Sequence, residues 1–270
     1  MTDGEVIRQS GWERWHDWQA EIMVPVTTWI CDAVAARPGM TVLDAACGTG
    51  LPALALAERL RPGGTLIATD VSPVMLDAVR RKAAAAGLDH VQVRESSLAS
   101  LQAEDASFDA VTCKDGLMYV PDPVDGAREL RRVLAPGGRY AITVWDEPAR
   151  CSFFRTMFGV VGRFLGPPAD PRGPGPLRLS APGVLEGVLH EAGFCGATIE
   201  TREVVFTFDS FAMYWEIIRE MAAPIAAAEA KLGPSELAAL KAALAEALAP
   251  FTHEGRIRLP NVALCATGVR

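Results

Sequence analysis

The feature that most constrains the fold is a regular alternation of short apolar segments and amphipathic segments between Thr41 and Trp145. Glycine or proline separates each apolar run from the amphipathic segment beside it. This alternation predicts right-handed crossovers and a doubly wound α/β fold with a mainly parallel, seven-stranded Rossmann-like sheet. The strands expected within this stretch are Thr41–Ala46, Thr65–Thr69, His90–Val93, Phe108–Cys113 and Arg139–Trp145, and the helices are Pro52–Leu60, Pro73–Ala86 (with Ser72 as N-cap) and Pro123–Leu134.

Outside this stretch the pattern becomes mainly helical. Apolar and aromatic positions at helical spacing predict a helix from Gly11 to about Ala36. Beyond Trp145 the expected order is helix Arg150–Leu165, loop Gly166–Pro176, capped helix Ser180–Ala192, strand Ala197–Phe208, a helical stretch from Phe211 to Ala249, and strand Asn261–Val269. We therefore expect a helical cap at 1–36, a ligand-binding core at 37–148, a lid at 149–179, and the rest of the core at 180–270 with a helical insertion at about 210–255.

Composition limits the possible partners. The net charge of -7 and the absence of long lysine or arginine runs argue against a nucleic-acid-binding surface. The most apolar stretch, Met221–Ala249, contains too many charged residues for a membrane span. The N-terminus lacks the pattern of a secretory signal. These features predict a cytoplasmic protein, a monomer or a homodimer, that acts on a small molecule without nucleic acid or membrane partners.

The 6 cysteines are scattered and form no pair or cluster with metal-ligand spacing. They are expected to be small, buried, reduced side chains, and we expect no metal requirement.

A glycine loop follows the first expected strand, in the segment Val42–Gly50. Glycines at such a turn let the backbone bend tightly and approach a ligand. Asp44 precedes the loop, where a buried carboxylate disfavours phosphate but suits a cationic group. Asp70 ends the second strand, where an acid accepts hydrogen bonds from ribose hydroxyls. The pattern indicates a nucleoside that lacks phosphate and carries positive charge.

Four segments together resemble one family. Val42–Gly50 and Ala68–Leu76 are similar to the first two motifs of class I S-adenosylmethionine-dependent methyltransferases, in the ubiquinone/menaquinone C-methyltransferase-like (type 11) branch. Phe108–Val111 and Arg132–Arg139 resemble the fourth strand and the turn into the fifth. The resemblance implies S-adenosylmethionine as methyl donor, S-adenosylhomocysteine as product, and a transferase activity.

The resemblance also implies roles for individual residues. Asp44 is expected to contact the methionine ammonium or order water beside it, and Asp70 to bind the ribose diol. Lys114 is expected to border the methionine through its backbone. The remaining donor-binding positions supply backbone around the methionine (Ala46, Gly48, Gly50) or flank the adenine (Val71, Met75).

The third motif departs from the family pattern. Its usual Gly-Asp-Ala is replaced by Ser96-Ser97-Leu98, so the acid that contacts the adenine amino group is missing. Ser97 and the backbone amide of Leu98 are the expected substitutes, with a weaker or water-mediated contact.

Three side chains are candidates for acid–base chemistry at the acceptor. His16, Asp115 and Tyr119 are placed by the pattern near the methyl group, and each also has an ordinary structural interpretation. His16 suits an exposed helix surface, Asp115 suits a cap for the turn at Gly116, and Tyr119 suits the core. Likewise, Trp12, Trp15 and Trp18 suit a packing stripe as well as a cation–π site.

The methyl acceptor is less well constrained than the donor. Aromatic and apolar side chains in the expected lid favour a small hydrophobic or aromatic acceptor, with the choice among C-, O- and N-methylation open. A binding module of the same fold that holds the donor without methyl transfer is the alternative. A nicotinamide-dependent oxidoreductase is disfavoured, because a third loop glycine and a catalytic tyrosine–lysine pair are both absent from the sequence.

Overall fold

The computed structural model describes residues 11–167, 170 and 173–270. One sheet organises them, with strands in the order β3-β2-β1-β4-β5-β8-β6, and a short strand, β7 (Thr252–His253), pairs with β8 off this path. The parallel part contains β1 (Thr41–Ala45), β2 (Thr65–Asp70), β3 (Val91–Glu95), β4 (Phe108–Lys114) and β5 (Leu134–Trp145). The doubly wound α/β prediction is confirmed, with β7 as an eighth strand beyond the expected seven.

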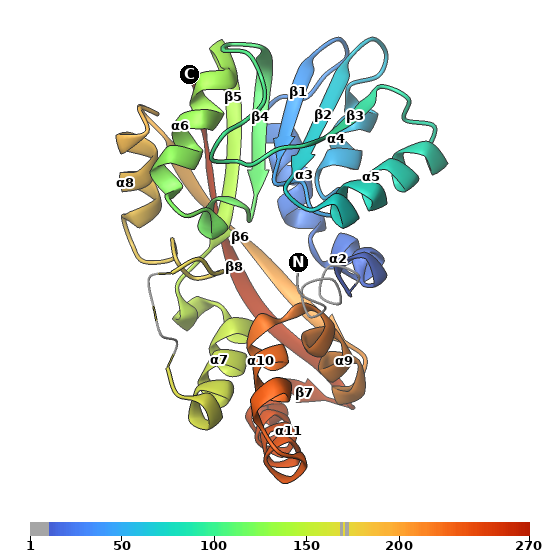
Figure 1. Cartoon of the computed structure of the whole chain (residues 1–270), viewed down its shortest axis with the longest axis vertical. Helices are drawn as coiled ribbons and strands as arrows, with labels where there is room; N and C mark the ends of the chain where they lie inside the picture. The colour runs from blue at the N-terminus through green and yellow to red at the C-terminus, as the bar shows by residue number, and fades with distance from the viewer. Residues whose placement is uncertain (1–10, 168–169, 171–172) are drawn as a thin grey trace.

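Strands β6 (Thr198–Phe208) and β8 (Arg256–Val269) complete the sheet and extend beyond it. β8 is antiparallel to both β5 and β6. Its pairing with β5 ends at Trp145↔Ala263, whereas its pairing with β6 continues to Phe208↔Ile257. β6 and β8 therefore continue as a two-stranded ribbon into the lower half of the molecule (Figure 1). The final strand begins at Arg256 rather than at the expected Asn261.

Helices around the parallel strands follow the expected alternation. They are α4 (Ala53–Arg59), α5 (Pro73–Ala85), α6 (Pro123–Val133) and α8 (Val184–Glu191). The Ser72 hydroxyl accepts a hydrogen bond from the Met75 backbone, so the predicted N-cap of α5 is confirmed. The predicted cap of α8 is wrong, because Ser180 donates to the Leu177 carbonyl and the helix begins later, after Gly183.

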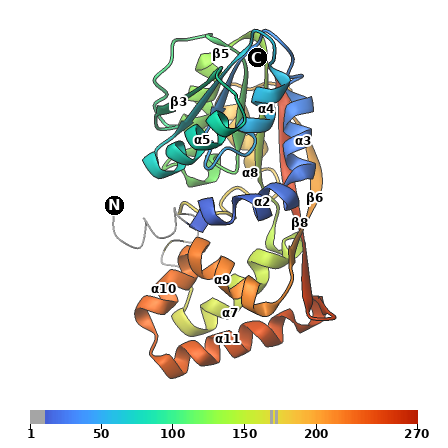
Figure 2. The same ribbon diagram turned by 90° about the vertical axis from the view of Figure 1, so that its right-hand side faces the viewer.

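The helix expected from Gly11 is interrupted at Trp15 and again at Met23. α2 (His16–Ile22) and α3 (Val24–Ala33) meet at Met23. Pro25 lacks the backbone N–H that a continuous helix needs at this position. α3 packs against the sheet, while α2 lies between the sheet and the lower helices (Figure 2).

The lower half consists of α7 (Ser152–Leu165), α9 (Phe211–Met221), α10 (Ala223–Lys231) and α11 (Pro234–Leu248). The single helical stretch expected from Phe211 to Ala249 is thus three helices. Pro224 and Pro234 lie in the first turns of α10 and α11, where a proline starts a new helix but could not continue an old one. α7 packs against α10, α11 and β8, which brings the segment after β5 together with the segment after β6.

Short 3₁₀ turns lie between several of the longer elements. The 3₁₀ turns are η1 (Leu117–Tyr119), η2 (Pro148–Arg150) and η3 (Ala249–Phe251). Cys195 is exposed, in contrast to the expected burial, because it lies in the turn between α8 and β6; the other cysteines are buried and all are free. Among the described residues, no helix is both long and apolar enough to cross a membrane.

Candidate functional site

The glycine loop lies directly after β1 and turns sharply back toward α4. Ala46, Gly48 and Gly50 all have positive φ angles, of 54°, 53° and 104°. The Cys47 backbone donates to the Thr69 carbonyl at 2.9 Å, which ties the loop to the end of β2. Apart from the neighbours of Gly48 in the chain, no atom of the described residues lies within 4 Å of the position where a Cβ on Gly48 would stand, so these residues leave space beside the backbone there.

Asp44 lies beneath this loop and is completely buried. One carboxylate oxygen, Oδ1, accepts a hydrogen bond from the Thr112 hydroxyl at 2.6 Å. The other, Oδ2, has no partner of normal hydrogen-bond geometry in the described part of the chain. Burial raises the pKa of Asp44 to about 7, although the Thr112 hydrogen bond and the charge of Lys114 oppose this shift. Within the described residues, Oδ2 of Asp44 is therefore left with the capacity to accept a further hydrogen bond.

Asp70 joins the glycine loop to the start of α5. Its Oδ2 accepts from the Gly48 backbone at 2.9 Å, and its Oδ1 accepts from the Ser72 backbone at 3.0 Å. Burial raises the pKa of Asp70, and these backbone hydrogen bonds act against the shift. Each oxygen retains a second lone pair, so the carboxylate can also accept from a diol.

The residues beside Asp70 present an apolar surface. Val71 is 64% exposed, and Met75 is half-buried in the first turn of α5. A large exposed aliphatic side chain next to a carboxylate suits the face of an adenine better than it suits water. The roles that the sequence predicted for these two residues stay predictions.

The departure from the family pattern lies just beyond β3. Ser97 is exposed, and its hydroxyl accepts a hydrogen bond from the Ala99 backbone at 3.2 Å, while Leu98 is buried. β3 pairs with β2 up to Glu95↔Asp70, so Ser97 follows on the same edge of the sheet as Asp70. The Ser97 hydroxyl is therefore exposed at this edge, where the family motif has a charged carboxylate.

Lys114 and Asp115 form an ion pair at the carboxyl end of β4. Lys114 Nζ lies 2.8 Å from Asp115 Oδ2, and the two side chains are only 13% and 14% exposed. Asp115 Oδ1 accepts from the Thr143 hydroxyl at 3.0 Å. The side chain therefore does not cap the turn at Gly116, which corrects that structural interpretation. Both oxygens of the proposed base already have partners.

Tyr119 ends the 3₁₀ turn η1 and is 49% exposed. Its interpretation as a core residue is wrong, because the turn directs the chain outward between two buried neighbours, Met118 and Val120. The ring is therefore available to a ligand at the carboxyl end of β4.

His16 is buried, at 7% exposure, so its interpretation as an exposed helix residue is also wrong. Its Nδ1 lies 2.8 Å from the hydroxyl oxygen of Thr49, within the glycine loop. Trp15 and Trp18 pack as a stripe, with their indole N–H groups donating to Glu220 and to the Thr207 carbonyl. The N-terminal segment thus touches the loop through His16 and not through these two tryptophans.

Several residues of the site were not predicted. The Thr112 hydroxyl donates to Asp44, and the Thr49 hydroxyl contacts His16. Lys82 donates to the Thr49 carbonyl. Trp145 ends β5, and its ring centroid lies 5.3 Å from that of Phe154 and 5.5 Å from that of Phe206. Only Thr112 left a usable signal, since it is the hydroxyl-bearing residue of the strand expected at Phe108–Cys113. No group of three potential metal ligands occurs among the described residues.

Comparison with known proteins is informative for the region around this loop. Residues 42–138 match the family model described as a methyltransferase domain. Demethylmenaquinone methyltransferase of Thermus thermophilus is 41% identical over 128 residues, which make up 46% of this chain and 57% of that protein. Nocamycin O-methyltransferase of Saccharothrix syringae is 37% identical over 123 residues, or 46% of this chain and 44% of that protein. The chain thus spans about half the length of these curated relatives.

Solved structures are similar over a larger part of the chain. A putative methyltransferase from Bacillus halodurans has a TM-score of 0.61 at 18% identity, with 90% of this chain and 97% of that one covered. An S-adenosylmethionine-dependent methyltransferase from Aquifex aeolicus has a TM-score of 0.54 at 20% identity, with coverages of 76% and 94%. At this level of identity the similarity establishes the fold.

Proposed function

We propose that this chain, whose residues 42–138 form a class I S-adenosylmethionine-dependent methyltransferase domain, transfers a methyl group to a small apolar or aromatic acceptor. The observation that carries the proposal is Asp70, whose carboxylate links the open backbone at Gly48 to the first turn of α5. This arrangement offers acceptors for a ribose diol beside a loop that leaves room for a ligand. When bound, the donor supplies a methyl group already activated by a sulfonium.

The residues of the site fit such a donor. Asp44 provides a buried negative charge with an unpartnered oxygen, which suits a cationic amino acid. Val71 and Met75 provide an apolar surface for a purine, and Ser97 offers a hydroxyl in place of the missing acid. Ala46, Gly50 and the Leu98 and Lys114 backbones complete the set of proposed contacts.

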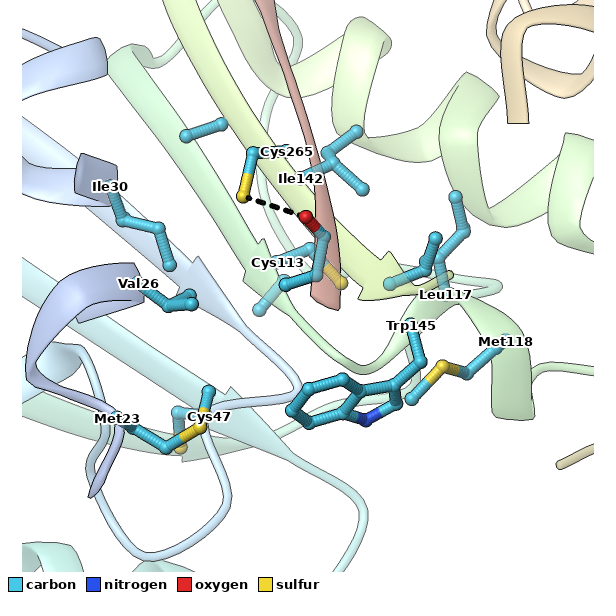
Figure 3. Close-up of a cluster of buried hydrophobic side chains, with 14 of the residues drawn as sticks. Met23, Val26, Ile30, Cys47, Cys113, Leu117, Met118, Ile142, Trp145 and Cys265 are labelled. Carbon is cyan, nitrogen blue, oxygen red and sulfur yellow. Dashed lines mark hydrogen bonds between the residues drawn. The ribbon is translucent and has the colours of Figure 1, made fainter. Parts of the chain in front are cut away.

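We infer that the acceptor binds beyond the carboxyl ends of β4 and β5. Open α/β sheets bind ligands at this edge. The buried side chains drawn there in Figure 3 include Met23, Cys47, Met118 and Trp145. These thioether, thiol and indole groups belong to the hydrophobic core, so the interior beneath the proposed acceptor region is apolar. The half-exposed Tyr119 and the Lys114–Asp115 pair are the polar groups nearest to this region along the chain.

The chain can therefore contribute positioning and water exclusion to methyl transfer. The helices of the lower half, α7 and α9 to α11, form the proposed acceptor side, whereas the sheet forms the donor side. Tyr119 and Asp115 remain the proposed candidates for handling the acceptor proton, whereas the burial of His16 against Thr49 disfavours His16 for this role. We further propose a cytoplasmic monomer or homodimer that does not bind nucleic acid, supported by the negative net charge and the free cysteines.

A binding module without turnover is the second candidate. The ion pair that holds Asp115 against Lys114 and the absence of an acid at Ser97 favour it. Two measurements distinguish these two functions. Calorimetry with S-adenosylhomocysteine tests donor binding, and incubation with methyl-labelled donor and a panel of phenols, amines and enols tests transfer. Donor binding with no labelled product from any acceptor would favour the module, and a failure to bind the donor would reject both functions.

A further inference from the structure

Thr49 is held on two sides at the apex of the glycine loop. Its hydroxyl oxygen lies 2.8 Å from His16 Nδ1, and its carbonyl accepts from Lys82 Nζ at 3.3 Å. Gly48 and Gly50, the neighbours of Thr49, both have positive φ angles. The backbone N–H groups of Cys47, Gly48 and Gly50 are hydrogen-bonded, so the contacts of Thr49 add to a loop that its backbone already holds in part. Because Thr49 is only 5% exposed, its side chain contacts other protein groups and is not available to a ligand.

The same N-terminal segment is anchored at its other side to α9. Arg14 forms ion pairs with Glu220 and with Glu216, the latter at 3.6 Å, and Trp15 donates to Glu220 at 2.8 Å. Gly11 packs so closely on Glu220 that an added Cβ would lie 2.6 Å from its carbonyl oxygen. Residues 11–22 therefore bridge the glycine loop and the lower helices, as the position of α2 in Figure 2 illustrates.

The surroundings of His16 do not suit a general base. Burial lowers the pKa of His16 to about 4, and the positive charge of Lys82 acts in the same direction. A base is most effective when its pKa lies near the working pH. The imidazole is thus neutral near pH 7, with one ring nitrogen already used in the contact with Thr49.

We infer that His16 is a positioning residue for the methyl donor: through its Nδ1 contact with Thr49 it fixes the glycine loop in the conformation that binds the donor. The conformation of the glycine loop and the packing of residues 11–22 against α9 are then coupled. The inference rests on the proposed donor site but not on any particular acceptor. A preorganised loop binds its ligand more tightly because less conformational freedom is lost on binding.

Asparagine and glutamine variants separate this role from simple packing. The side-chain amide of His16→Asn places a polar atom where Nδ1 stands, whereas that of His16→Gln places one nearer to Nε2. We expect His16→Ala and His16→Gln to weaken S-adenosylhomocysteine binding about three- to tenfold, the range for one lost hydrogen bond. His16→Asn is expected to retain most of the affinity. Calorimetry measures all three variants, without any acceptor.

Changes at Thr49 provide the reciprocal test. Thr49→Val removes the hydroxyl at nearly constant volume and is expected to weaken binding as His16→Ala does, whereas Thr49→Ser is expected to bind like the wild type. In the double variant His16→Ala/Thr49→Val the losses should not add, since both remove the same contact. Glu21→Gln, an exposed change on the same helix, is the matched control and should leave affinity unchanged.

Three results would overturn the inference. One is an unchanged affinity in His16→Ala accompanied only by a lower melting temperature, which indicates a packing role. Another is a His16→Asn variant as weak as His16→Ala. The third is a loss confined to turnover at saturating donor, which assigns His16 to acceptor chemistry. If the wild-type protein binds no S-adenosylhomocysteine, the proposed function fails instead.

Discussion

Asp70 is the residue on which the proposed donor site most directly depends. Its two oxygens accept from backbone groups of separate segments, Gly48 and Ser72. We expect Asp70→Ala to weaken binding of S-adenosylmethionine at least about tenfold, because a charged acceptor for the ribose is lost. Calorimetry checks this, with Asp77→Ala, an exposed acid on α5, as the control. Equal affinities for Asp70→Ala and the wild type would contradict the ribose assignment.

Asp44 predicts a pH dependence of donor binding. Its pKa of about 7 means that the carboxylate becomes negative as the pH rises through neutrality. Because the proposed ligand is cationic there, affinity should increase between about pH 6 and pH 8. Asp44→Asn should remove this increase. Calorimetry at several pH values measures it, and a flat profile in the wild type would count against a contact between Asp44 and the donor.

The same shift has the opposite effect on the free protein. The folded-state pKa is raised above the usual 3.8, so protonation of Asp44 favours the folded state. Its contribution to the free energy of unfolding is fully present below about pH 4 and is lost as the pH rises through about 7. Donor binding thus offsets a cost that the empty site carries at neutral pH.

At the scale of elements, the contact between the glycine loop and the turn after β4 allows no extra atoms. A Cβ on Gly116 would lie 2.5 Å from the Cβ of Ala46 and 2.9 Å from the sulfur of Cys113. We expect Gly116→Ala to lower the free energy of unfolding by about 1–3 kcal/mol and to weaken donor binding, because the loop must move. Denaturant unfolding and calorimetry measure the two effects.

Gly187→Ala is the matched control for this substitution. Gly187 is an exposed residue in the interior of α8, and nothing lies within 4 Å of its added Cβ. Alanine there should stabilise the protein by up to about 1 kcal/mol through better helix propensity. If both variants behave alike, the close contact at Gly116 is not significant.

The parallel sheet and the donor loop could be predicted from sequence because their signals are local. Apolar periodicity and glycine turns mark β1 to β5. Asp44 and Asp70 could be identified because each lies near the end of a predicted strand. The prolines at 25, 224 and 234 also carried a local signal, and the single-helix predictions overlooked it. By contrast, the burial of His16 involves its contact with Thr49, which lies far away in sequence. No periodicity reports such contacts.

At the scale of the whole molecule, the two halves are expected to unfold together. β6 and β8 pair without interruption from Thr198↔Thr267, within the sheet, to Phe208↔Ile257, among the lower helices. Loss of either half would leave part of this ladder unpaired. We expect a single calorimetric transition whose van't Hoff and calorimetric enthalpies agree. Two resolved transitions would show that the lower helices fold as an independent unit.

The shared ribbon also limits how the chain can be divided or recombined. A fragment that stops near residue 148 would lack β8, so the edge of β5 would stand open with unpaired backbone groups along Arg139–Trp145. Such an edge invites self-association, and we expect the fragment to aggregate. Segments exchanged with those of related proteins to alter acceptor choice are best confined to the connections at the far end of the ribbon. A one-residue insertion within the ribbon would instead reverse the face that every following side chain presents.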